Sequence, residues 1–153
     1  MKRWIIYLAV LALCSTSSVR KTDIGELAPV EAVWLSEKDG QVYLRTDTAD
    51  VGFGADVQSA AANMKATASR TILLETADYL IVEQGREALI QQVYDILRPS
   101  CKICVSRAMP DMGKVVQFLK THAPQITIRQ YQVETNTLPI LKEQEGRLQW
   151  LAK

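Results

Sequence analysis

Two cysteines three residues apart, Cys101 and Cys104 in "CKIC", are the first candidates for chemistry in this chain. A Cys-x-x-Cys pair reacts as a dithiol when it opens a helix, because the helix N-terminus stabilises a thiolate. Here the pair opens "CKICVSRA", a segment typical of a strand. In an extended chain the two residues lie about 10 Å apart and point to opposite faces, whereas a disulfide requires Cα atoms within about 7 Å. We therefore expect two small buried strand residues. A thiol-disulfide redox protein that uses Cys101 and Cys104 is the alternative.

Metal chemistry has few possible ligands. One Cys-x-x-Cys and the single histidine, His122, cannot fill a tetrahedral Cys/His zinc site, and no carboxylates are spaced like a ligand pair. We predict neither a metal nor a cofactor. His122 is expected to cap the C-terminal end of a helix, where positive charge is favourable.

The sequence also lacks the nucleophile motif of many hydrolases, since no serine lies in a G-x-S-x-G turn. Glu26 with Glu31, or Asp47 with Asp50, could be an acid–base pair, but charged groups near strand ends are commonly just solvated. The stretch "VGFGADV" resembles part of a phosphate-binding loop, yet it lacks the third glycine and the lysine. We expect its glycines to serve a turn that enters a helix, and we predict no catalytic residue.

The N-terminus has the order of an export signal. Lys2 and Arg3 precede an unbroken apolar run, Trp4 to Leu13, and small polar residues follow. Ten residues in a helix rise about 15 Å, roughly half the thickness of a bilayer core, so a stable span is not expected. Residues 1–14 are interpreted as a leader, and 15–26 as a tether. Residues 27–153 are interpreted as one globular domain.

Cys14 gives the leader a second meaning. Leu11 to Cys14, "LALC", resembles the bacterial lipobox, in which the cysteine is lipid-modified after cleavage, although Leu13 departs from the usual small residue. Lipidation at Cys14 would anchor the chain to the outer side of the cell membrane. Ordinary cleavage between Ala12 and Ser18 is a second hypothesis. A third hypothesis is that the apolar run is a core element of a cytosolic protein. The basic start and the lack of amphipathic spacing both argue against it.

Charge argues against nucleic acid as a partner. The chain carries 18 basic and 17 acidic residues, and removing residues 1–13 with Lys2 and Arg3 leaves 16 against 17. A balance this close to zero offers no basic excess to neutralise phosphates.

The rest of the chain alternates between predicted strands and helices. Strand patterns occur at "APVEAVWLS" and "QVYLRTDT", which form a hairpin, and at "TILLE", "YLIVE", "CKICVSRA" and "ITIRQYQV". Helices are predicted after the cap Asp56, from Arg86 to Arg98, and after Asp111. A closing hairpin is predicted for "PIL" and "LQWLA" around "EQEG". The order β-β-α-β-α-β-α-β indicates an α/β fold, or α+β, with a mixed sheet and three helices packed on it.

The order of these elements resembles the N-terminal domain of the Ger(x)C family, the lipoprotein subunits of spore germinant receptors. The similarity covers roughly residues 23–120, including "DIGELAPVEAVWLSEKDGQVYLRTDT", "DVQSAAANM" and "YLIVEQGREALIQQVYDILRPS". Members have a histidine before the strand corresponding to "YLIVE" and are more than twice as long, and this chain departs from both features. The resemblance implies a non-enzymatic subunit of a membrane complex with a role in germination or sporulation.

Together these patterns predict an exported, membrane-tethered interaction or structural module. Its partners would be the membrane, through the lipid on Cys14, and protein subunits of a receptor complex. Contacts are expected at sheet edges or at exposed apolar residues such as Trp150 or Trp34, and a place in the core is the alternative for both tryptophans. A small-ligand site in the crevice at the strand C-termini is a third possibility.

Overall fold

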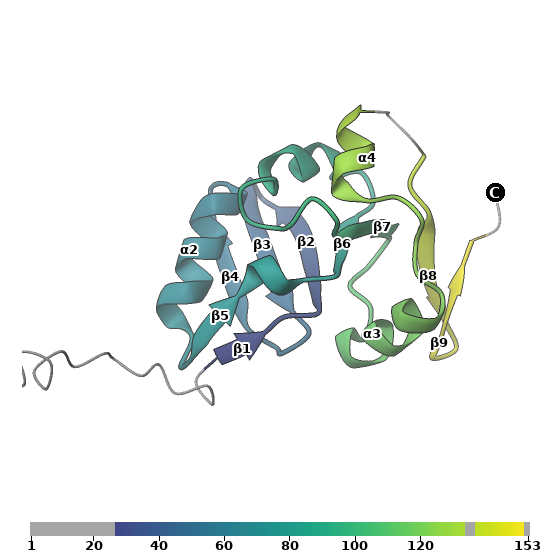
Figure 1. Ribbon diagram of the computed structural model, residues 1–153, viewed down its shortest axis with the longest axis horizontal. Helices are drawn as coiled ribbons and strands as arrows, with labels where there is room; N and C mark the ends of the chain where they lie inside the picture. Colours follow the sequence, from purple (N-terminus) through teal and green to yellow (C-terminus); the bar gives the residue numbers. More distant parts are fainter. Residues whose placement is uncertain (1–26, 134–136, 152–153) are drawn as a thin grey trace, which may run out of the picture.

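The computed structural model describes residues 27–133 and 137–151. Its centre is a seven-stranded mixed sheet with the strand order β4-β3-β2-β6-β7-β8-β9 (Figure 1). Strands β2, β6, β7 and β8 are parallel neighbours, whereas β3, β4 and β9 run antiparallel to the strands beside them. The strands are β2 (Ala32–Lys38), β3 (Gln41–Thr46), β4 (Val51–Gly54), β6 (Tyr79–Glu83), β7 (Lys102–Ser106), β8 (Ile140–Gln144) and β9 (Arg147–Trp150). The predicted α/β class with a mixed sheet is confirmed.

Helices cover both faces of this sheet. Helices α2 (Val57–Thr67) and α4 (Ile128–Val133) contribute to one face, and α3 (Met112–Thr121) covers the other. Two 3₁₀ segments, η2 (Leu74–Thr76) and η3 (Glu87–Gln92), lie in the connections. A separate two-stranded parallel sheet joins β1 (Leu27–Pro29) to β5 (Thr71–Leu73). The result is a three-layer arrangement in which the sheet separates two apolar clusters.

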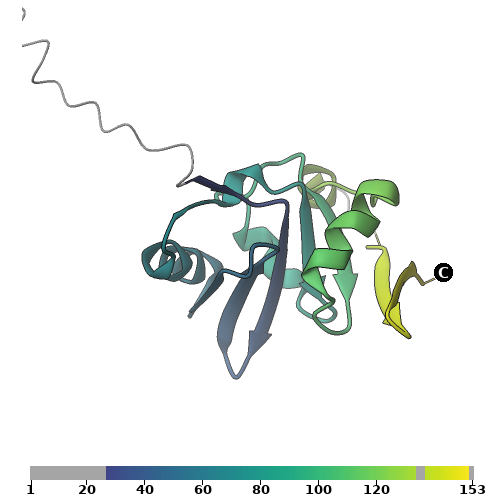
Figure 2. The same ribbon diagram turned by 90° about the horizontal axis from the view of Figure 1, so that it is seen from below.

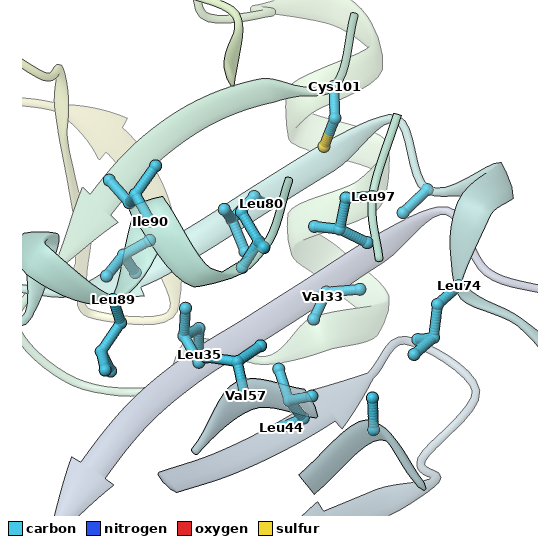
Figure 3. Packing of buried hydrophobic residues seen from close by; sticks show 14 of the residues in the cluster. Val33, Leu35, Leu44, Val57, Leu74, Leu80, Leu89, Ile90, Leu97 and Cys101 are labelled. Atoms are coloured by element: carbon cyan, nitrogen blue, oxygen red, sulfur yellow. The ribbon is translucent and has the colours of Figure 1, made fainter. Parts of the chain in front are cut away.

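The first core cluster lies on the face covered by α2, η3 and α4. Alternate residues of the central strands point into it, among them Val33 and Leu80 (Figure 3). Ile103 of β7 belongs to the same cluster. The residues one position along, such as Trp34 and Ile81, enter the second core cluster beneath α3. This period of two is the reason that buried parallel strands are apolar on both faces.

Both predicted hairpins are confirmed. The turn between β2 and β3 has positive φ angles at Asp39 (54°) and Gly40 (75°), and the turn between β8 and β9 has them at Glu145 (52°) and Gly146 (73°). Two successive residues with positive φ define the turn whose twist matches a two-residue hairpin, and glycine at the second position adopts it without steric cost.

The predicted helix from Arg86 to Arg98 is wrong. Only Glu87–Gln92 forms a helical segment, of 3₁₀ type, and turns follow it to the start of β7. Leu89, Val93 and Leu97 are nevertheless buried in the first core cluster, and Ile96 is partly buried against it. Burial of these side chains therefore directs the backbone here, and the β-branched residues in the segment weaken the competing α-helix.

The predicted strand "ITIRQYQV" is also wrong. Only Thr127 forms an antiparallel bridge, with Lys102, and the chain then enters α4. The Gln130 side-chain oxygen accepts from the Thr127 N–H (2.9 Å), and the Gln130 N–H donates to the Thr127 hydroxyl (3.3 Å). This reciprocal pair is a capping box, which starts a helix.

The prediction that the glycines of "VGFGAD" serve a turn is wrong. They lie in strand β4, and α2 packs directly on them. A Cβ added at Gly52 would lie 2.1 Å from the Ala60 carbonyl oxygen, and one at Gly54 would lie 2.6 Å from the Ala60 nitrogen. Glycine is therefore needed because helix and strand backbones approach each other closely. The predicted cap Asp56 is confirmed, since its carboxylate accepts from the Ser59 N–H at 2.7 Å.

Within the described ranges, no helix is long and apolar enough to cross a bilayer. The predicted leader, Cys14 and the tether at 15–26 lie outside the described residues.

Candidate functional site

The two cysteines of "CKIC" enter different layers of the molecule. Cys101 lies in the first core cluster, where its sulfur points toward Leu97 and Leu80 (Figure 3), and Cys104 lies in the second. Both are free thiols and fully buried. Burial raises the pKa of the Cys101 thiol to about 12 and also raises the pKa of Cys104, because a thiolate is poorly solvated there. This geometry gives a redox dithiol no support.

The described carboxylates proposed as acid–base pairs have other partners, and Glu31 forms an ion pair with Lys120. The Asp47 side chain accepts from the N–H groups of Glu31 and Ala32, at 3.0 and 3.2 Å, where β2 begins. Asp50 accepts from the Thr48 hydroxyl at 2.7 Å and pairs with Arg70 at 3.7 Å. Glu26 lies outside the described residues.

A shallow hollow lies at the carboxyl ends of β7 and β8, where the sequence suggested a ligand crevice. Its lining includes Ser106, Arg107, Met109 and Glu143. The Ser106 hydroxyl already donates to the Ala108 carbonyl at 2.8 Å, and Glu143 accepts from the Asp111 N–H at 3.4 Å. Two polar groups of the hollow, Ser106 and Glu143, are thus engaged by the loop that leads into α3, and a third, Arg107, donates to the Gln84 side chain at 3.3 Å. Across residues 27–133 and 137–151, no three His, Cys, Asp or Glu side chains are grouped as metal ligands.

The two edges of the central sheet differ. At the β4 edge, the outward N–H of Phe53 donates to the Asn63 side chain of α2 at 3.2 Å. The close approach of α2 at Gly52 and Gly54 keeps that helix against the strand. An edge covered in this way is protected from pairing with another chain.

No strand of the described residues pairs with the outer side of β9, and we call this the open β9 edge. The Leu151 N–H donates to the Ile140 carbonyl at 2.9 Å, and Lys142 lies opposite Gln149. Because hydrogen-bonded pairs alternate in an antiparallel ladder, Gln149 also faces β8, whereas the backbone N–H and C=O groups of Leu148 and Trp150 face outward. Figure 2 shows the β8–β9 hairpin (yellow) at the outer limit of the molecule, beside α3 (green).

An aromatic groove runs between α3 and this strand. Its apolar floor comes from Phe118, Leu148 and Trp150, and its other lining includes Lys114, His122 and Arg147. The rings of Phe118 and Trp150 are 5.6 Å apart, and the indole N–H donates to the His122 carbonyl at 3.2 Å. We call this the α3–β9 groove.

His122 closes α3, as the sequence predicted. Its N–H donates to the Phe118 carbonyl at 2.8 Å, and its ring stacks on Phe118 with centroids 4.8 Å apart. The two tryptophans differ: Trp34 is 4% exposed and belongs to the second core cluster, so for Trp34 the core alternative is confirmed and the contact surface is wrong. Trp150 is partly buried and lines the groove.

Comparisons with known proteins add no relationship: no family model matches the chain, and neither a curated protein nor a solved structure gives a significant match.

Proposed function

We propose that this protein is an exported, membrane-tethered module that binds another protein and catalyses no reaction itself. The leader is the observation that carries the proposal. A basic start, a ten-residue apolar run and the lipobox-like "LALC" precede the domain. The described fold begins at Leu27, so a lipid on Cys14 would keep the domain within roughly 45 Å of the membrane at full extension.

The domain supports binding better than catalysis. The buried thiols lie in separate clusters, and the carboxylates of Asp47 and Asp50 are engaged by backbone, hydroxyl or arginine groups. The open β9 edge and the adjoining groove, in contrast, present apolar side chains and backbone groups that no other described strand pairs with. The resemblance to Ger(x)C lipoproteins makes a germination-associated membrane complex the first place to search for a partner.

Metabolic labelling with palmitate tests the tether. The wild-type chain and a Ser15→Ala variant should incorporate label into the membrane fraction, whereas Cys14→Ser should not. Ser15→Ala is the matched control because it changes the neighbouring residue and keeps the thiol. Equal labelling of Cys14→Ser and wild type, or an uncut chain in the cytosol, contradicts the proposal.

A further inference from the structure

We draw no further inference here: the strongest candidate, the exposed apolar patch that Val51 and Phe53 form on the face of β4 opposite α2, carries nothing, because nothing among the residues that the structure describes shows what covers it.

Discussion

The contact between β4 and α2 gives the sharpest test of the fold. In Gly52→Ala the added Cβ would lie 2.1 Å from the Ala60 carbonyl oxygen and 2.6 Å from the Met64 Cβ. Neither distance is compatible with van der Waals contact, and the closer atom belongs to the helix backbone. Helix α2 must therefore move by about 1 Å or β4 must leave the sheet. Overpacking usually costs 1–3 kcal/mol, and we expect about 3 kcal/mol here because a backbone has to move.

The matched control is Gly113→Ala. An added Cβ in α3 would meet only the Asp111 carboxylate oxygen, at 3.5 Å, and alanine favours a helix over glycine by up to about 1 kcal/mol. The same substitution should therefore destabilise at one position and be neutral or stabilising at the other.

Urea denaturation followed by circular dichroism measures both free energies of unfolding, and thermal unfolding provides a second reading. A loss of about 3 kcal/mol corresponds to roughly 12 °C in Tm for a domain of this size. A Gly52→Ala protein with wild-type stability would refute the reasoning, because it would mean that α2 does not pack on β4 at this distance.

Two further predictions concern buried polar groups. Since burial raises the pKa of the Cys101 thiol from 9.0 to about 12, the native state keeps a proton that the unfolded chain releases. The free energy of unfolding should therefore fall between pH 9 and 12, by up to about 1.4 kcal/mol per pH unit. Cys101→Ala should make that slope shallower in urea titrations at pH 8 and 10 without removing it, because burial also raises the pKa of Cys104; an unchanged slope would contradict the assignment. Thr46 is fully buried, and its hydroxyl lies 2.8 Å from the Thr48 hydroxyl and accepts from the Asp50 N–H at 3.1 Å. Thr46→Val should lower the free energy of unfolding by about 1–2 kcal/mol; chemical denaturation at pH 7 measures it, and a stability equal to wild type would count against this network.

Local patterns predicted the elements whose signals are local. Both hairpins follow from turn residues between β-branched runs, and α2 and α3 follow from Asp56 and Asp111 ahead of apolar faces. The signal for α4 was also present: Thr127 and Gln130 have the spacing of a capping box. The alternation of "ITIRQYQV" concealed it, because four apolar residues in eight fit either period.

The sequence predicts some residues of the candidate site but not how they are arranged in space. The sequence predicts contact surfaces at the sheet edges and at Trp150. It predicts Trp34 in the same way, although Trp34 is buried. Which strand forms an open edge depends on strand order, and β8 lies beside β7 only after the chain has passed through α3 and α4. Sequence patterns carry no information on that order.

The sequence by itself determined the α/β class, the turns, the helix caps and the apolar periodicity, because each depends on residues a few positions apart. Tertiary structure alone decided that α2 packs directly on Gly52 and Gly54. It also decided that Cys101 and Cys104 lie in opposite layers, and that β9 is the outer strand beside Phe118. These features depend on segments that are distant in the chain, and it is their packing that selects one arrangement.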